Sequence, residues 1–229
     1  MKKLIAIRKT ILQQLILTVI LALPFITTAQ HLTKYVDPFI GTGAHGHNYP
    51  GATVPFGMVQ LSPDNGTQGW DWCSGYHFTD SMIAGFSHTH LSGTGIGDLC
   101  DISVMPSIGW VANSFTLYRE KFAHANEKAT PGYYAVTLNN GIKAAFTTTE
   151  RCGLHQNTFP KGADPVIRFN LGFAINWDSA IETFMEKLND STIVVIVIPK
   201  VGPPCSGFIL LPELLCHLQK FFWQTERKV

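Results

Sequence analysis

Two short segments hold the residue types best suited to binding or catalysis. The first, GWDWCSGYH at residues 69–77, places Trp70 and Trp72 on either side of Asp71. In an extended segment alternate residues share a face, so the two indole rings could stack on a sugar ring while Asp71 accepts hydrogen bonds from its hydroxyl groups. A structural role is the alternative, with one tryptophan in the core and the other covering a sheet edge. We expect at least one of the two to be structural.

The second segment, GFSHTHLSGTGIGDLCD at residues 85–101, contains a His-x-His pair. On a strand, His88 and His90 would point to the same side, which is a common arrangement in zinc and copper sites. Asp98 and Asp101 are close enough in sequence to add a carboxylate. The same histidines could equally bind a polyol ligand or nearby backbone, and a His-x-His pair alone is weak evidence for a metal. We therefore assign no metal site to the chain.

Another pair with this spacing, His45 and His47 in the sequence GAHGH, lies within a glycine-rich stretch. Glycine lets the backbone turn tightly and approach a ligand closely, so we expect this loop at the rim of a polar pocket. Other chemistries have less support. The sequence GTGIG at 93–97 lacks the lysine of a phosphate-binding loop, and no GxSxG element for a serine nucleophile occurs.

The composition argues against one class of partner. Of the 229 residues, 45% are hydrophobic and 14% are charged, with a net charge of +1. Nucleic-acid-binding proteins need a surplus of lysine and arginine to neutralise phosphates, so we expect no nucleic-acid partner. The chain has 15 phenylalanines, 5 tryptophans and 6 tyrosines. This aromatic content favours a body rich in β-strands.

The first 29 residues have the pattern of an export signal. An apolar stretch from Ile11 to Ile26 precedes the small residues Thr27, Thr28 and Ala29, which suits signal-peptidase cleavage near Ala29. The basic residues before the apolar stretch are Lys2, Lys3, Arg8 and Lys9. A membrane anchor is the alternative, but glutamines and a proline interrupt the apolar run. We expect a periplasmic or secreted protein with no stable membrane span after cleavage.

Five cysteines form an odd number, so in an oxidising compartment at least one thiol is expected to stay free or to pair between chains. They are Cys73, Cys100, Cys152, Cys205 and Cys216. No CxxC pair is present, which argues against a structural zinc site.

The body of the chain is expected to be an all-β, antiparallel two-sheet β-sandwich. The segments 133–138 and 142–149 flank Asn139-Asn140-Gly141, a hairpin signal because Asn-Gly accepts the positive φ of tight turns. Short strands separated by regular turns are typical of sandwiches. Further strands are predicted at 102–106, 153–159, 165–173 and 191–196. Helix is expected only at the start of the leader and at the far C-terminus.

The C-terminal residues 195–229 differ in character from the rest, because they are apolar and lack polar turns. Read one nucleotide earlier, the codons for residues 195–203 permit Gly-Tyr-Arg-Tyr-Ser-Lys-Gly-Trp-Ala, an ordinary soluble sequence. We therefore interpret residues 195–229 as an out-of-frame tail, residues 1–29 as a signal peptide and residues 30–194 as the sandwich domain. A buried helix or a C-terminal anchor are the alternatives, and the flanking DNA decides between them.

Several blocks of sequence, taken in order, resemble the N-terminal domain of glycoside hydrolase family 92, a family of calcium-dependent exo-α-mannosidases. The blocks span residues 35 to about 194 and are YVDPFIGTG, HGHNYPGATVPFGMVQLSPD, GWDWCSGYH, GFSHTHLSGTGIGDLCDISVMP, ATPGYYAVTL and LGFAINWD. One departure is Cys100, where the family usually has a small residue such as glycine.

The resemblance implies a β-sandwich that packs against a C-terminal (α/α)₆ barrel, with the sugar site at the junction. It also implies that the barrel, which we expect to be missing here, carries the catalytic carboxylates and most calcium contacts. No catalytic residue and no calcium binding are therefore expected in this chain. The substrate-binding residues implied by the match are Trp70, Asp71, Trp72, Cys73 and His77, with His88 and His90 as further candidates.

Three functions stay open at this point. The first is an N-terminal fragment of an inverting α-mannosidase that acts on mannose-containing glycans, with pocket residues but no activity of its own. The second is a stand-alone carbohydrate-binding sandwich. The third and weaker one is a histidine-rich metallohydrolase.

Overall fold

The computed structural model describes residues 2–22, 32–109, 118–176, 178–199, 205–210 and 221–224. The chain divides into two compact units, Met1–Tyr35 and Val36–Val229. The first contains the helix α1 (Lys2–Ala22), which covers most of the predicted export signal, and the short 3₁₀ helix η2 (Leu32–Tyr35). Among the described residues, no helix has the length and apolar content required to cross a membrane. The predicted cleavage position, Ala29, lies outside the described residues.

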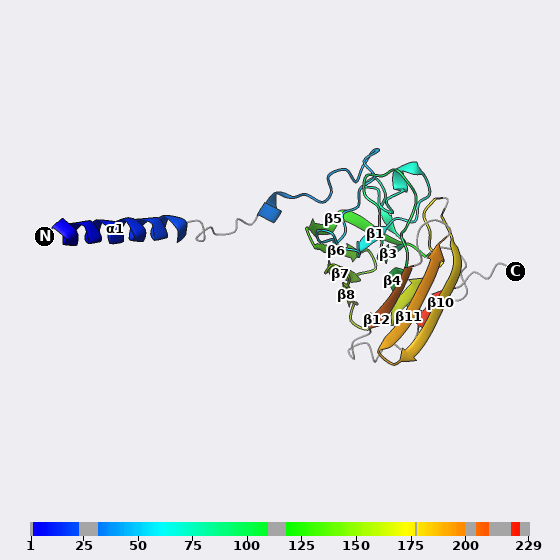
Figure 1. Ribbon diagram of the computed structural model, residues 1–229. Helices are drawn as coiled ribbons and strands as arrows, with labels where there is room; N and C mark the ends of the chain where they lie inside the picture. Colours follow the sequence, from blue (N-terminus) through cyan, green and yellow to red (C-terminus); the bar gives the residue numbers. More distant parts are fainter. Residues whose placement is uncertain are drawn as a thin grey trace. The chain divides into compact units, whose positions relative to one another are not determined.

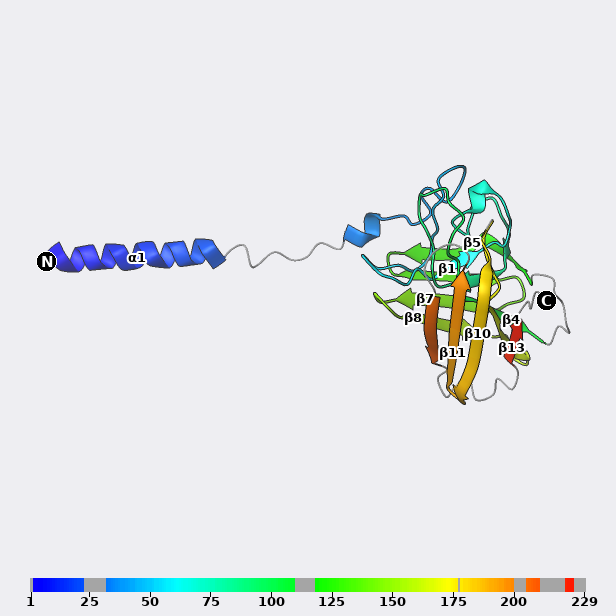
Figure 2. The ribbon, with the colours of Figure 1, turned by 45° about the vertical axis from the view of Figure 1, so that its right-hand side comes forward.

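The second unit is built from three β-sheets (Figure 1). The central sheet has the order β1-β3-β4-β9-β13, with strands Ser62–Asp64, Gly85–Ser87, Ser103–Ile108, Pro165–Asn170 and Phe221–Gln224. The second has the order β2-β5-β6-β7-β8, with strands Met82–Ile83, Glu120–Thr130, Tyr133–Leu138, Lys143–Thr148 and Gly153–Thr158. The third has the order β10-β11-β12, with strands Ala180–Asn189, Thr192–Pro199 and Cys205–Leu210, seen side by side in Figure 2. Among these strands, only β13 and β9 pair in parallel.

The central sheet contributes to two hydrophobic cores, one on each face. Successive residues of a strand point to opposite faces, and in β4 Met105 joins the core shared with the second sheet while Val104 joins the core shared with the third. Phe146 on β7 contacts Phe86 on β3, with ring centres 4.4 Å apart. On the other face, Val195 of β11 is fully buried in the same cluster as Val104. The two outer sheets therefore hold the central strands and the loops that follow them in place.

The predicted all-β, antiparallel sandwich is confirmed, and the third sheet adds a layer to it. Strands occur at each segment predicted from the sequence. The Asn-Gly hairpin forms between β6 and β7, where Gly141 has φ 87° and its N–H donates to the Leu138 carbonyl oxygen at 2.9 Å. The expectation of helix at the far C-terminus was wrong for residues 221–224, which pair with β9 as a strand.

Two of the longest strands, β5 and β10, were not predicted from the sequence. Lysine, glutamate and alanine, which are depleted in strands on average, make up seven of the eleven residues of β5 and four of the ten residues of β10. Their long pairing with β6 and β11 overrides this preference. A change of register between Phe122 and Glu127 also breaks the regular alternation in β5.

The predicted boundary at residue 194 falls inside a strand. β11 continues without interruption from Thr192 to Pro199, and Val197 is 1% exposed. The first residues of the predicted tail are therefore part of the core. The proposed change of reading frame concerns the gene and stays a prediction.

Candidate functional site

The segment GWDWC forms a short 3₁₀ helix, η3 (Trp70–Trp72), and not the extended chain that we expected. The Cys73 N–H donates to the Trp70 carbonyl oxygen at 3.2 Å. Since a 3₁₀ helix has three residues per turn, residues two apart point in different directions. Trp70 is 54% exposed, whereas Trp72 is half-buried against a hydrophobic cluster that includes Cys100. The two indoles therefore form no common platform, and Trp72 is the structural one.

Three separate segments meet around Trp70 in what we call the Trp70 cluster, made up of Trp70, Asp71, His45, His47 and Gly95. The Trp70 Nε1–H donates to the Gly95 carbonyl oxygen at 3.0 Å. The Trp70 ring lies 4.4 Å from the His47 ring and 5.2 Å from the His45 ring, measured between centres. His45 Nδ1 lies 2.6 Å from Asp71 Oδ1. The histidine pair of the GAHGH loop thus belongs beside Trp70 and Asp71, a grouping that the residue spacing alone did not reveal.

The electrostatics of the Trp70 cluster favour hydrogen-bond acceptance by Asp71. The hydrogen bond with His45 lowers the pKa of the Asp71 carboxyl, and so do charges on the nearby imidazoles. His47 is 6% exposed, and its Nε2 has no hydrogen-bond partner and lies 3.7 Å from Asp71 Oδ1. An exposed indole and an ionised carboxylate suit a ligand that has both C–H surface and hydroxyl groups.

Cys73 and His77, two other predicted ligand residues, lie behind this surface. Cys73 is 1% exposed, and burial raises the pKa of its thiol. His77 contacts the Trp72 ring, bonds the Ala44 carbonyl oxygen through Nε2 at 3.0 Å, and lies 2.8 Å from Thr79 Oγ1 through Nδ1. Because both ring nitrogens already have partners, His77 supports the loop of His45 and does not present a free donor.

His88 and His90 do not share a ligand, although their spacing favoured this. His88 bonds the Ile102 carbonyl oxygen through Nδ1 at 2.7 Å, and its Nε2 lies 3.0 Å from Nε2 of His155 on β8. His90 instead faces Gln60 and Asp64. The two histidines leave the end of β3 toward different neighbours, so they do not form a two-histidine metal site.

The His88–His155 pair makes the domain sensitive to acid. Burial lowers the pKa of both imidazoles. As the pH falls through about 6.5, the unfolded chain therefore takes up protons before the folded one does, so stability is complete above this pH and decreases below it. The expected slope is at most about 1.4 kcal/mol per pH unit for each histidine. Urea denaturation between pH 7.5 and pH 5, in steps, measures it.

The double variant His88→Gln, His155→Gln serves as the comparison for this titration. Carboxyl groups titrate in both proteins, so the difference between the two slopes isolates the histidines. The double variant should show the flatter profile. Equal slopes in the two proteins would contradict the expected uptake of protons on unfolding.

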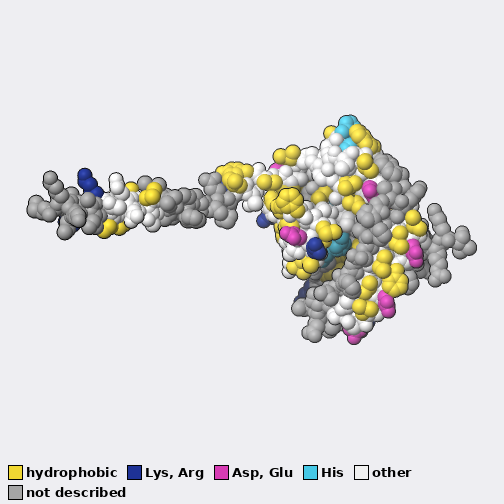
Figure 3. All heavy atoms as spheres, viewed as in Figure 1, with side chains coloured by type: hydrophobic (Ala, Val, Ile, Leu, Met, Phe, Trp, Pro, Cys, Tyr) yellow, Lys and Arg dark blue, Asp and Glu magenta, His cyan; other side chains and the backbone are white. Residues whose placement is uncertain are grey.

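Two hollows of the surface lie away from the Trp70 cluster. One of about 310 Å³ is lined by Glu182, Phe184, Ile196 and Ile198 on the outer face of β10 and β11. Hydrophobic side chains gather on this face, with acidic ones between them (Figure 3). Ile181, at 70% exposure, and Phe184, at 46%, are among them. Another hollow, of about 270 Å³, follows the outer face of β5 to β8. Neither hollow is lined by a residue of the Trp70 cluster.

One close group of side chains among the described residues could hold a metal ion, and its donor atoms do not suit calcium. Calcium takes six to eight oxygen ligands. The one close group of His, Cys, Asp and Glu side chains among the described residues is Asp64, His90 and Cys100, with a single carboxylate. A calcium requirement therefore stays a prediction about a larger enzyme.

A family model described as the glycosyl hydrolase family 92 N-terminal domain matches residues 35–200 of the chain. The chain belongs to glycosyl hydrolase family 92. The resemblance seen in the sequence blocks is thereby confirmed. The match covers the whole Trp70 cluster and every strand from β1 to β11.

Solved structures of family 92 have a similar fold. The family GH92 α-mannosidase BT3965 from Bacteroides thetaiotaomicron, in complex with mannoimidazole, is 38% identical with a TM-score of 0.72, over 78% of this chain and 25% of that one. The inverting mannosidase BT2199 from the same organism is 28% identical with a TM-score of 0.58, over 74% of this chain and 23% of that one.

A curated relative is an uncharacterized secreted glycosidase from Arthroderma benhamiae, 34% identical over an alignment of 153 positions that covers 60% of this chain and 19% of the relative. This family 92 chain thus spans a quarter or less of the length of these three relatives.

Proposed function

We propose that this chain is the N-terminal part of an exo-acting α-mannosidase that removes terminal α-mannosyl residues from glycans with inversion. In this proposal the Trp70 cluster is a wall of the sugar pocket, and the bond-breaking carboxylates lie on another part of the enzyme. Family membership and the mannosidase relatives support the reaction class. The observation that carries the assignment of the site is the exposed Trp70 ring beside the ionised Asp71.

Asp71 is suited to recognising hydroxyl groups and not to acid catalysis. Inverting glycosidases use two carboxyl groups about 6.5–9.5 Å apart, one of which must stay protonated at working pH to act as the general acid. The hydrogen bond with His45 lowers the pKa of Asp71, which favours the ionised form. Asp71 is also the only carboxylate of the Trp70 cluster. The chain by itself is therefore expected to release no sugar.

Three further parts of the proposal concern the larger enzyme. Calcium would be bound mainly by residues outside this chain, as the family resemblance implies. The glycan would lie between the Trp70 cluster and the (α/α)₆ domain that the family resemblance implies. Export to the periplasm or the medium is supported by the leader pattern and by a relative described as secreted.

The test combines an activity assay with a binding measurement on the full chain. Hydrolysis of an aryl α-mannoside should not exceed the buffer rate. In a ¹H–¹⁵N NMR titration with mannobiose, the indole N–H resonance of Trp70 should shift, and that of the half-buried Trp72 should shift less. Trp70→Ala should weaken binding by about tenfold or more, which corresponds to about 1.4 kcal/mol. Phe184→Ala, which removes an exposed aromatic ring on β10, should leave binding unchanged.

The same measurements distinguish the proposed function from the alternative, a stand-alone carbohydrate-binding sandwich. The exposure of Trp70 favours some binding by the isolated chain, but the apolar surface of β10 and β11 favours association with other protein. Tight, saturable binding of mannobiose by this chain alone would support the stand-alone function. Measurable cleavage by the chain alone, or mannobiose shifts that leave Trp70 unaffected, would overturn the proposed function.

A further inference from the structure

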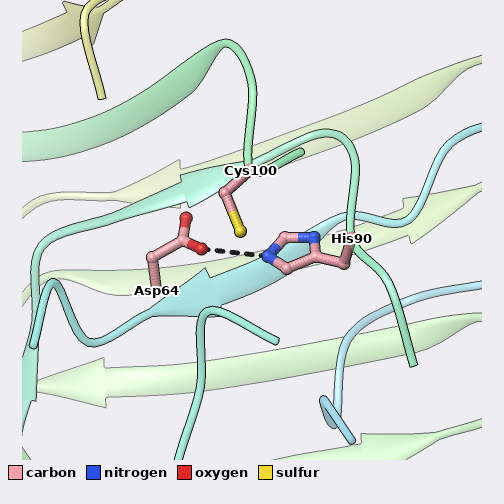
Figure 4. A group of neighbouring side chains, drawn as sticks. All are labelled: Asp64, His90 and Cys100. Atoms are coloured by element: carbon pink, nitrogen blue, oxygen red, sulfur yellow. Dashed lines mark hydrogen bonds and ion pairs between the residues drawn. The ribbon is translucent and has the colours of Figure 1, made fainter. Parts of the chain in front are cut away.

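A second cluster of chemically active side chains lies at the end of the central sheet and shares no residue with the Trp70 cluster. It consists of Asp64 at the end of β1, His90 just after β3 and Cys100 just before β4. One ligand atom from each of the three lies within 4.8 Å of the others. Figure 4 shows the carboxylate, the imidazole and the thiol pointing toward a common centre.

The three side chains are removed from water. Asp64 and Cys100 are fully buried, and His90 is 3% exposed. Asp64 Oδ1 lies 3.0 Å from His90 Nε2, while Asp64 Oδ2 accepts the Ser87 N–H at 2.9 Å. The Ser87 hydroxyl oxygen, also buried, lies 3.1 Å from His90 Nε2. A fourth oxygen donor is therefore next to the three-residue cluster.

The hydrogen bonds of His90 leave two acceptor atoms, His90 Nε2 and Asp64 Oδ1, facing each other. His90 Nδ1 lies 2.7 Å from the Gln60 carbonyl oxygen, which can only accept, so Nδ1 carries the hydrogen. A neutral imidazole then has a lone pair at Nε2. This lone pair faces Asp64 Oδ1, another acceptor, at 3.0 Å. Three arrangements can satisfy this contact: a second proton on His90, a hydrogen bond donated by the Ser87 hydroxyl to Nε2, or a metal ion that bridges the two side chains.

Three observations favour the metal ion. A metal-binding histidine usually donates its other ring N–H to a backbone carbonyl or a carboxylate, as His90 does to Gln60. Two ligand atoms about 2.0 Å from a tetrahedral zinc ion lie roughly 3.3 Å apart, close to the observed 3.0 Å between His90 and Asp64. Thiolate and imidazole ligands select zinc over calcium or magnesium.

Charge balance also favours a zinc ion at this position. A zinc ion with a carboxylate and a thiolate has no net charge, and a neutral group is far cheaper to bury than an isolated ion. On binding, the ion would replace the thiol proton, the sulfur–metal bond would form, and the proton would leave to solvent.

We propose that Asp64, His90 and Cys100 bind a structural zinc ion, with the Ser87 hydroxyl in the fourth position. The ion links the ends of β1, β3 and β4, which are neighbours in the central sheet. From the sequence we assigned no metal site, and we expected His90 to point to the same side of a strand as His88. Only the fold brings His90 to a cysteine and an aspartate that lie ten and twenty-six residues away in sequence.

The test uses the full chain, purified once with zinc and once with a chelator, and then loaded with cobalt. Mass spectrometry of metals should find about one zinc per chain in the first preparation. The cobalt form should show the near-ultraviolet absorption of a thiolate–cobalt bond. Cys100→Ser should remove this absorption and weaken metal binding by more than about a hundredfold, beyond the 10–100-fold cost of losing a supporting residue. Cys152→Ser, which alters an exposed thiol, should retain both.

If Cys100→Ser does not fold, X-ray absorption at the zinc edge of the unaltered chain tests the proposal without any variant. The spectrum should contain one sulfur among nitrogen and oxygen ligands. A folded chain that binds neither zinc nor cobalt stoichiometrically would overturn the proposal. A zinc shell without sulfur, or loss of the cobalt band in Cys152→Ser, would overturn it as well. None of these outcomes depends on mannoside binding.

Discussion

Replacing Gly75 by alanine is expected to destabilise the domain by about 3 kcal/mol or more, through backbone strain and a steric collision together. Gly75 has φ 83°, in the left-handed region that costs other residues roughly 1–2 kcal/mol. A Cβ at this position would collide with Asp64 Oδ1 and would lie 3.1 Å from both Cys100 Sγ and His90 Cδ2. Overpacking of this kind adds roughly 1–3 kcal/mol. Urea denaturation followed by circular dichroism measures the loss.

Gly162→Ala is the matched control for this substitution. Gly162 has φ 80°, and a Cβ there would meet nothing within 4 Å. The control therefore carries the strain of the left-handed backbone without the collision and should cost only about 1–2 kcal/mol. If the two variants lose the same stability, the close packing of Gly75 against the Asp64 carboxylate has no energetic importance.

Replacing Glu127 by alanine is expected to cost about 3–5 kcal/mol, the range typical of breaking a buried charged network. The Glu127 side chain is fully buried on β5. It accepts hydrogen bonds from the hydroxyl groups of Tyr134 at 2.6 Å and Tyr76 at 3.1 Å, and its other neighbour is His124 Nδ1 at 2.6 Å. Both tyrosines are fully buried, so their hydroxyl groups would lose their acceptor and find no water to replace it.

Two further variants test the origin of this loss. Glu127→Gln keeps the shape and one acceptor oxygen, so it should recover part of the stability. Glu186→Ala removes an exposed glutamate from another strand, β10, and should change the unfolding free energy by less than about 0.5 kcal/mol. Thermal and urea denaturation compare the three variants. A Glu127→Ala loss no larger than that of Glu186→Ala would show that water enters the site and satisfies the tyrosines.

Local sequence determined most strands and the family. The β6–β7 hairpin is specified by neighbouring residues, because Asn140 and Gly141 supply the turn and alternating apolar residues supply the buried face. The ordered blocks around GWDWCSGYH identify family 92 for a similar reason, since they depend on the order of residues and not on their positions in space. The strands β5 and β10 were missed because their lysine and glutamate content resembles that of exposed helices.

Tertiary structure alone decided which side chains share a site. Trp70 turns away from Trp72 because its indole N–H bonds Gly95, twenty-five residues later. His88 and His90 are two residues apart, yet one bonds His155 and the other faces Asp64. Outside regular strands, the direction of a side chain depends on distant hydrogen-bond partners and not on the spacing of its neighbours. The sequence therefore identified the chemically active segments, whereas the packing of the sheets and loops determined which of their residues meet.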